Sequence, residues 1–166
     1  MSQNWSIKEA TPDDIPDLLK LVVGLAVYEK EPDAVTCTPE MMRKAIFEDK
    51  YAHALIVRLD SGEAVALCIY FFTYSTWLGK PGLWVEDIFV IPELRGSGIG
   101  KALFGHVGEI ALERDCGRVE WCVLKWNTPS IEFYEKKLGA TPQVEWQDER
   151  LEGTEAIKKL AALKHK

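Results

Sequence analysis

The chain has few of the features that mark metal centres, secreted disulfide scaffolds or membrane spans. It contains four cysteines, Cys37, Cys68, Cys116 and Cys122. No two of them form a C-x-x-C pair and no histidine lies at ligand spacing from them, which argues against zinc and predicts reduced thiols. The first residues show no basic region followed by an apolar run, and the longest apolar run, residues 64–72, is too short to span a bilayer. We therefore expect no metal ion, no membrane insertion and a cytoplasmic location.

Positive charge is also scarce. Twenty lysines and arginines stand against 26 aspartates and glutamates, which gives a formal net charge of −6. Binding to nucleic-acid phosphates needs a basic surface, so this balance argues against a nucleic-acid partner. An acidic surface attracts cations and is therefore compatible with a cationic substrate. Solubility alone explains the same excess of acids, so the charge gives such a substrate only weak support.

The pattern of apolar residues and turn signals predicts one mixed α/β domain over residues 1–166. Thr11-Pro12 and Thr38-Pro39 have the N-cap and first-turn chemistry of helix starts. Asp60-Ser61-Gly62 separates two apolar runs as the turn of a β-hairpin does. The predicted strands cover residues 5–8, 51–59, 63–74, 83–90, 118–124 and 146–151. Three further helices are predicted over residues 100–115, over residues 130–138 and from Thr154 onward.

The most informative stretch is residues 83–100, LWVEDIFVIPELRGSGIG. It predicts an apolar strand, a turn at Pro92 and a glycine-rich loop, residues 95–100, that opens a helix. Glycines let a backbone approach a ligand closely, and the N–H groups at a helix start bind anions. The loop therefore indicates a ligand with a pyrophosphate, although a tight connection would use the same residues.

Two common phosphate motifs fit this loop poorly. A P-loop needs G-x-x-x-x-G-K-[ST], which the chain lacks. A dinucleotide fingerprint needs G-x-G-x-x-G, and Gly96 and Gly98 supply only its first half because Lys101 occupies the third glycine position. Glu120 lies at about the expected distance for a ribose-binding acid, but early in its strand. Coenzyme A is the third possibility, and downstream residues bear on it.

Residues 126–140 read WNTPSIEFYEKKLGA. Together with the RGSGIG loop, this segment resembles the GCN5-related N-acetyltransferases, and above all the branch of the spermidine/spermine (diamine) acetyltransferases and their thialysine-acetylating relatives. Tyr28-Glu29, residues 70–80 and residues 85–90 carry the same likeness, which extends over residues 7–151. The resemblance implies a single-domain GNAT fold, which is a mixed α/β fold whose central, mostly antiparallel, twisted sheet is flanked by helices.

The resemblance also implies acetyl-CoA as the cosubstrate. The residues expected to bind it are Ile88, Phe89, Val90, Arg95, Gly96, Ser97, Gly98, Ile99, Gly100, Lys101, Asn127, Pro129 and Ser130. In the family, the strand that holds the first three pairs its backbone with the pantetheine amides, so their side chains are uninformative. Arg95 and Lys101 flank the loop and are suited to neutralise phosphates. Surface cations are ordinarily solvated, so only the motif around Arg95 and Lys101 supports a role for them in phosphate binding.

Acetyl transfer from a thioester to an amine needs a base for the ammonium, whose pKa is about 10.4, and an acid for the departing thiolate. Tyr134 is the candidate acid, because a phenol with a pKa of about 10 keeps its proton at neutral pH. The resemblance implies that Tyr134 reaches the coenzyme A sulfur. A helix in which Phe133 and Tyr134 only pack against the core is the alternative interpretation.

Glu86 is the candidate base, acting directly or through a water. Two adjacent acids inside an apolar strand, Glu86 and Asp87, are costly to bury unless they are paired or used. Regular alternation predicts that Asp87 shares a face of the strand with Val85 and Phe89. The resemblance places Glu86 beside the substrate amine and lets Asp87 help hold the cationic chain. A purely structural alternative pairs one acid with a basic group such as Lys80 or Arg43.

By resemblance, Tyr28 and Glu29 line the amine site, while a helix end with a solvated acid explains them equally well.

The predicted function is an acetyl-CoA-dependent N-acetyltransferase that works by direct transfer in a ternary complex. Its predicted substrate is a small cationic amine, such as a polyamine, a diamine or the lysine-like thialysine. The family implies a homodimer. The alternatives are acetylation of a protein lysine or N-terminus, and a non-catalytic module that binds coenzyme A.

Overall fold

The computed structural model describes residues 4–164. The chain divides into two compact units at the junction of Leu124 and Lys125. The first unit contains every strand of the described chain and the larger helices, and the second contains α4 and α5.

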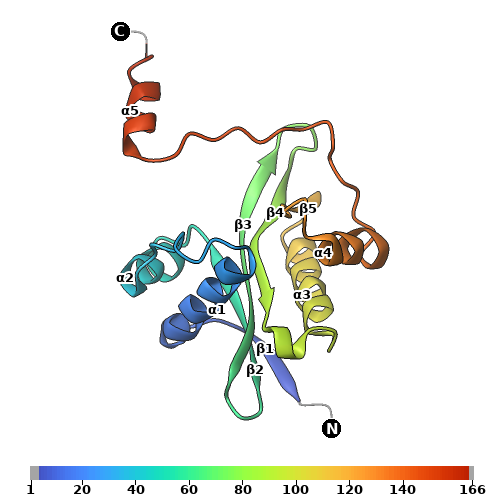
Figure 1. Cartoon of the computed structure of the whole chain (residues 1–166). Coiled ribbons are helices and arrows are strands. Elements are labelled where there is room, and N and C mark those ends of the chain that lie inside the picture. The colour runs from blue at the N-terminus through green and yellow to red at the C-terminus, as the bar shows by residue number, and fades with distance from the viewer. Residues whose placement is uncertain (1–3, 165–166) are drawn as a thin grey trace. The chain divides into compact units, whose positions relative to one another are not determined.

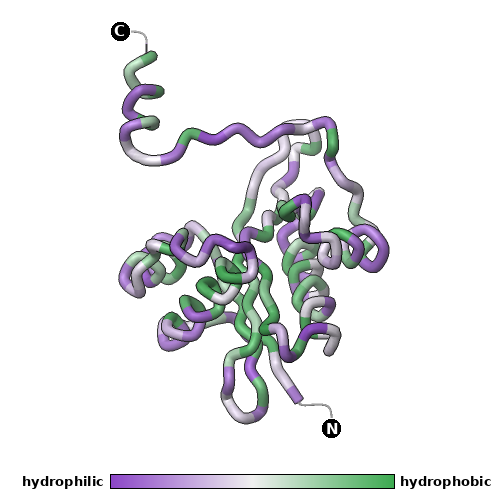
Figure 2. Tube along the Cα trace, in the orientation of Figure 1, coloured by the Kyte–Doolittle hydropathy of each residue, from purple (hydrophilic) through white to green (hydrophobic). Residues whose placement is uncertain are grey.

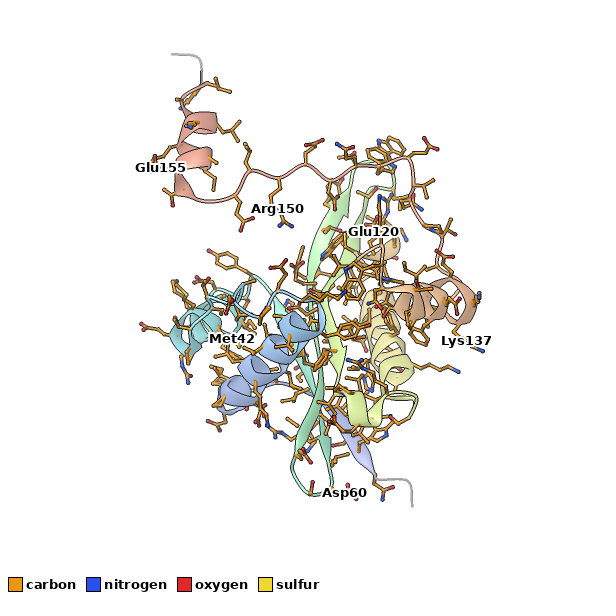
Figure 3. All side chains as sticks on the ribbon, viewed as in Figure 1. Met42, Asp60, Glu120, Lys137, Arg150 and Glu155 are labelled. Carbon is orange, nitrogen blue, oxygen red and sulfur yellow. The ribbon has the colours of Figure 1, made fainter. Side chains whose placement is uncertain are left out.

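A five-stranded sheet forms the centre of the first unit, in the order β1-β2-β3-β4-β5. The strands are β1 (Trp5–Glu9), β2 (His53–Leu59), β3 (Ala64–Ser75), β4 (Lys80–Val90) and β5 (Arg118–Trp121). All neighbours are antiparallel except β4 and β5, which are parallel. The predicted hairpin is confirmed as β2 and β3, and Gly62 at its turn has a φ of 89°, which glycine adopts without strain. Asp60 marks the tip of this hairpin in Figure 3. The mixed α/β fold with a mostly antiparallel sheet is therefore confirmed.

Helix α1 (Ile15–Tyr28) covers one face of the sheet and α3 (Ile99–Glu113) covers the other (Figure 1). The α1 face buries a cluster that includes Leu18, Leu67 and Phe89. The α3 face buries a second cluster that includes Val85 and Leu103. Figure 2 shows the apolar sides of both helices turned toward the apolar strands. Burial of these two apolar faces is the main favourable term that holds the unit together.

The helix starts predicted at the two Thr-Pro pairs are confirmed. Pro12–Asp14 form a 3-10 turn, η1, that leads directly into α1. Thr38 Oγ1 accepts a hydrogen bond from Met41 N at 3.2 Å and caps the short helix α2 (Pro39–Met42), which continues as a π-helix, η2 (Arg43–Glu48). This capping satisfies a backbone donor that a helix start would otherwise leave without a partner.

A β-bulge interrupts β4 at Glu86. Asp87 pairs with Ile69 and Val85 pairs with Tyr70, so Glu86 is an extra residue with no partner on β3. The extra residue shifts the alternation of side chains by one position. Phe89 consequently lies in the α1-side cluster and Val85 in the α3-side cluster. The expectation that Asp87 shares a face with both Phe89 and Val85 is therefore wrong for Val85.

The second unit begins with α4 (Thr128–Glu132), which continues as a π-helix, η4 (Phe133–Lys137). Gly139 follows this helix with a φ of 74°, as the predicted glycine stop requires. An extended segment then leads to α5 (Thr154–Ala161), seen between the orange and red parts of Figure 1. Gly153, rather than the predicted Thr154, is the N-cap residue of α5.

The strand predicted over residues 146–151 is wrong, since this segment has no strand among the described residues. Trp146 is 73% exposed and Leu151 is 58% exposed. A strand needs a neighbour for its hydrogen bonds and a face to bury, and the four residues between Trp146 and Leu151 are all polar or charged, as the hydrophilic colour of this segment in Figure 2 reflects. β5 is also shorter than predicted, because it ends at Trp121 instead of continuing to residue 124.

Candidate active site

One edge of β4 is open over its second half. β5 pairs with β4 only from Gly82 to Val85, so from Glu86 to Val90 no strand among the described residues lies along that edge. The pairing ends where the bulge begins, because a bulge bends and twists its strand away from a regular neighbour. Backbone N–H and C=O groups on this edge are then available to a ligand that runs alongside the strand.

The end of the open edge lies at Val90. Its carbonyl oxygen accepts a hydrogen bond from Arg95 Nε at 3.2 Å, while Ile91 N donates to Val65 O at 3.0 Å on the opposite, β3 side. The first turn of α3 lies close by, since a Cβ built on Gly100 would be 4.0 Å from Val90 Cγ2. The strand end, the loop and the start of α3 therefore form one continuous surface.

The glycine-rich loop connects the 3-10 turn η3 (Pro92–Leu94) to α3, and it needs its glycines for their backbone angles. Gly96 has a φ of 78° and Gly98, the N-cap residue of α3, has a φ of 92°. A Cβ at either position would meet nothing within 4 Å, so the positive φ rather than crowding selects glycine. Because an N-cap glycine has no side chain, it leaves the first N–H groups of α3 available to an anion.

The remaining residues of the loop divide between core and solvent. Ser97 and Lys101 are exposed, and Ser97 Oγ donates to Leu94 O at 2.6 Å. Ile99 is only 1% exposed and belongs to the α3-side core. Its expected part in cofactor binding is therefore restricted to its backbone N–H. The side chains of Arg95 and Lys101 are both exposed at the two ends of the loop.

Three carboxylates, from Glu29, Glu86 and Asp87, gather on the α1 side of the open edge. Burial raises the pKa of Asp87 to about 6, and the nearby charges of Glu86 and Glu29 add to the rise. Burial also raises the pKa of Glu29. The structure thus brings together three of the residues that the sequence assigned to the amine, and their mutual repulsion favours any cation that binds among them.

Glu86 differs from Asp87 in its surroundings. Glu86 is exposed, and its Oε2 accepts a hydrogen bond from Trp84 Nε1 at 2.9 Å. Lys80, which the structural alternative would pair with one of these acids, instead pairs with Asp115 at 2.7 Å. Burying the Asp87 carboxylate beside like charges is costly without a function, which favours the functional interpretation of this pair.

Tyr28 and Glu29 form the end of α1. The guanidinium carbon of Arg95 lies 4.4 Å from the centre of the Tyr28 ring, and Glu29 N donates to Leu25 O at 2.9 Å as the helix closes. Gly24, one turn earlier, brings α1 close to β4, since a Cβ there would lie 2.9 Å from Phe89 Cε1. The helix end is therefore held beside the open half of β4, where an amine-binding residue is needed.

The second unit carries the remaining candidates. Asn127 is the N-cap residue of α4 and is 8% exposed, and its carbonyl accepts from Ile131 N at 3.1 Å. Pro129 is exposed in the first turn, and Ser130 is half-buried. Tyr134 is half-buried on the π-helical turn η4, with its ring centre 5.8 Å from that of Phe133. Single-turn π-helices occur frequently at functional sites, so this local geometry agrees with a working tyrosine.

Sequence reasoning missed the bulge at Glu86, the hydrogen bond from Trp84, and the contact between Arg95 and Tyr28. Trp84 stands two residues before Glu86, and this period-two spacing was the available signal. The other two features depend on strand register and tertiary packing.

Within residues 4–164, no group of three His, Cys, Asp or Glu is arranged to hold a metal ion. No helix in the same range is long and apolar enough to cross a membrane.

Comparison with known proteins identifies the family. Residues 22–140 match the model of the acetyltransferase (GNAT) family. The thialysine N-epsilon-acetyltransferase of Bos taurus is 39% identical, over 93% of this chain and 96% of that protein. The spermidine/spermine N(1)-acetyltransferase-like protein 1 of Homo sapiens is 31% identical, over 78% of this chain and 20% of that protein.

A solved structure supports the fold. An integron cassette protein from the mobile metagenome of V. cholerae matches with a TM-score of 0.78 and 24% identity, over 97% of this chain and 98% of that chain. Because this likeness concerns the backbone, it supports the arrangement of sheet and helices and says nothing of substrates. The family model and the Bos taurus relative together show that the chain belongs to the GNAT family of acetyltransferases, in the branch that the sequence resembles, and that it is an amine N-acetyltransferase.

Proposed function

We propose that the protein transfers the acetyl group of acetyl-CoA to a primary amine of a small cationic molecule, by direct transfer in a ternary complex. The observation that carries this proposal is the set of three carboxylates, Glu29, Glu86 and Asp87, beside the open edge of β4. Carboxylates in this arrangement attract an ammonium group and accept its proton. The open edge next to them suits a cofactor that presents its reactive end at the same place.

The residues present fit coenzyme A. The backbone of Ile88, Phe89 and Val90 lies on the open edge, and the loop from Arg95 to Lys101 offers positive φ glycines, helix N–H groups and two cations to a pyrophosphate. Asn127, Pro129 and Ser130, which belong to the second unit, are also proposed to bind coenzyme A. When bound, acetyl-CoA supplies an activated acyl group as a thioester.

Proton removal from the amine is assigned to the pair Glu86 and Asp87. A general base works best when its pKa lies near the working pH, and the pKa of Asp87 is raised to about 6. Glu86 is the exposed member, so it is the one that a substrate ammonium or a bridging water can reach from solvent. Glu86 is therefore proposed to take the proton, directly or through a water, and the buried Asp87 carboxylate beside it stabilises the positive charge of the amine.

Tyr134 is proposed to return a proton from its phenolic oxygen to the departing sulfur. A general acid of this kind contributes about 10²–10⁴-fold to a rate. Tyr134→Phe should therefore lower kcat by about 10²–10⁴-fold with little change in coenzyme A affinity, because only the hydroxyl group is removed. Tyr51→Phe, which alters a tyrosine that is 74% exposed, is the matched control and should leave kcat unchanged. Unchanged kcat in Tyr134→Phe would remove the tyrosine from the mechanism.

The acids and the relatives both support a small cationic amine as the substrate class. The Bos taurus relative is named for thialysine and the human relative for spermidine and spermine. A diamine or polyamine would use the acids along its length, and a lysine-like amine would use them at its ammonium end. The greater identity to the thialysine enzyme favours a lysine-like amine. A homodimer and a cytoplasmic location belong to the same proposal, and light scattering at micromolar concentration tests the dimer.

The proposal is tested by thiol release from acetyl-CoA against a panel of amines. The panel contains spermidine, spermine, putrescine, thialysine, lysine, an aminoglycoside and a lysine peptide. Fast turnover on one small amine, lost in Tyr134→Phe, supports the proposal and identifies the substrate class. Turnover on the peptide alone would replace it with protein acetylation. Coenzyme A binding without turnover on any amine would replace it with a non-catalytic binder.

A further inference from the structure

Arg95 touches the strand expected to bind the cofactor and the helix end expected to bind the amine. Its Nε donates to Val90 O at 3.2 Å. Its guanidinium carbon lies 4.4 Å from the centre of the Tyr28 ring and 5.7 Å from that of Phe89. Val90 ends β4 on the open edge, and Tyr28 ends α1 next to Glu29. The side chain of Arg95, in the glycine-rich loop, therefore contacts both the end of β4 and the end of α1.

The partners that hold Arg95 in this position are uncharged. They are a backbone carbonyl and two ring faces, and none of the ion pairs within residues 4–164 involves Arg95. Hydrogen bonds between a guanidinium and a phosphate are charge-assisted and stronger than those to a neutral carbonyl. Arg95 is exposed, so a phosphate at the loop can reach it. A phosphate-bearing ligand is thus able to exchange these partners for its own.

The neighbouring backbone leaves room for this exchange. Gly96 follows Arg95 with a φ of 78°, and a Cβ there would meet nothing within 4 Å. No packed side chain therefore fixes the loop on that side. When Arg95 turns toward a phosphate, it releases the Val90 carbonyl and the Tyr28 ring in the same movement.

The position of Arg95 on the Tyr28 ring opposes a cationic amine. A guanidinium on the Tyr28 ring occupies the face that an ammonium would use, and its positive charge repels an ammonium that approaches the same ring. We propose that Arg95 makes amine binding depend on the cofactor: the phosphates of coenzyme A draw the guanidinium off Tyr28, so the amine binds more tightly to the loaded protein. This inference rests on the proposed function, because it takes a phosphate-bearing cofactor and a cationic amine as the two ligands.

The inference makes Arg95 a positioning residue whose effect is a coupling between two binding equilibria. Coupling of this kind is reciprocal, so the amine must raise the affinity for coenzyme A by the same factor. Typical couplings are about 5–150-fold. A residue that only held the loop in shape would change the affinity for coenzyme A without changing this ratio.

The test measures the Kd of thialysine by calorimetry, with and without saturating coenzyme A, and repeats it with putrescine. Coenzyme A carries no acetyl group, so no turnover occurs. In the natural protein we expect the Kd to fall at least about fivefold when coenzyme A is present. In Arg95→Met the Kd without coenzyme A should fall to the loaded value, so the ratio becomes about one.

Lys101→Met is the matched control. It removes the other cation of the same loop, which is exposed in the first turn of α3. Coenzyme A should bind more weakly to this variant, and the coupling ratio should stay at the natural value. Tyr28→Phe, which keeps the ring and removes the hydroxyl group, should also keep the ratio.

Three results would overturn the inference: a ratio of one in the natural protein, an equal ratio in Arg95→Met and the natural protein, or loss of amine binding in Arg95→Met with and without coenzyme A. These outcomes differ from failure of the proposed function. Acetyl transfer to a small amine without coupling removes only the role of Arg95. No transfer to any amine removes the proposed function itself.

Discussion

The two halves of β4 differ in what lies beside them. From Lys80 to Val85 the strand has β3 on one side and β5 along most of the other. From Glu86 to Val90 it keeps β3 but loses β5. The first half contains Leu83, which is completely buried, and the second contains the Glu86–Asp87 pair and the Val90 carbonyl. A single inserted residue at Glu86 separates the half that is paired on both edges from the half whose outer edge is open.

The largest expected effect concerns the acids of the open half. The logarithm of kcat/KM for the preferred amine should rise with pH through about 6, as Asp87 loses its proton. Glu86→Gln should move this rise to lower pH, because the charge of Glu86 helps to raise the pKa of Asp87. Asp87→Asn should remove the rise and lower kcat/KM by about 10²–10⁴-fold. An identical pH profile in Glu86→Gln and the natural protein would exclude this pair as the base.

The paired half should respond in stability rather than in chemistry. Leu83 is 0% exposed, so Leu83→Ala should lower the free energy of unfolding by about 2–5 kcal/mol, measured by urea titration. Leu112→Ala, at a leucine that is 82% exposed, is the matched control and should change it by less than about 0.5 kcal/mol. Equal losses in the two variants would contradict the structural role assigned to the paired half.

A third prediction links Asp87 to the pH dependence of stability. Its pKa is about 6 in the folded protein against 3.8 as the reference, so the folded state binds more protons between these values. The free energy of unfolding should therefore fall as pH rises through this window, and the loss is complete above about pH 6. Asp87→Asn should raise stability at neutral pH by roughly 1–3 kcal/mol and flatten the curve. Glu29, whose pKa is also raised, acts in the same direction, so some slope should persist.

Urea titrations of both proteins at several pH values would check this. If the free energy of unfolding of Asp87→Asn depended on pH as in the natural protein, the Asp87 carboxylate would be as well solvated in the folded state as in the unfolded chain. Its charge would then not destabilise the fold.

The smallest expected effect concerns the contact between Gly24 of α1 and Phe89 in the open half of β4. A Cβ at Gly24 would lie 2.9 Å from Phe89 Cε1, whereas a Cβ at Gly105 in α3 would meet nothing within 4 Å. Gly105→Ala should raise the free energy of unfolding by about 0.5–1 kcal/mol. Gly24→Ala gains the same helix propensity but must displace the ring, which costs about 1–3 kcal/mol, so its net effect should be a loss of about 0–2 kcal/mol. Equal gains would show that α1 does not press on Phe89.

Local patterns predicted most of the fold. The hairpin at Asp60-Ser61-Gly62, the helix stop at Gly139 and the glycine-rich loop follow from the chemistry of a few adjacent residues, and each is found as expected. The strand predicted over residues 146–151 failed because strand formation depends on a neighbour, which a local pattern does not supply.

The candidate site was predicted in its residue types but not in its geometry. The adjacent acids Glu86 and Asp87 were evident as an anomaly in an apolar strand. Their different surroundings arise from the bulge, which is fixed by pairing with β3 and has no local signature in the sequence. The contact of Arg95 with Tyr28 joins residues far apart in the chain, so only the packing of α1 against β4 brings it about.

The most direct test of the central claim is mass spectrometry of a competition reaction. The protein is incubated with acetyl-CoA and equal concentrations of thialysine, spermidine, putrescine and a lysine peptide, and each acetylated product is measured at early times. The account predicts that a small cationic amine accumulates acetyl groups first and that Asp87→Asn suppresses this product about 10²-fold or more. Acetylation of the peptide alone, or of no amine, would contradict it.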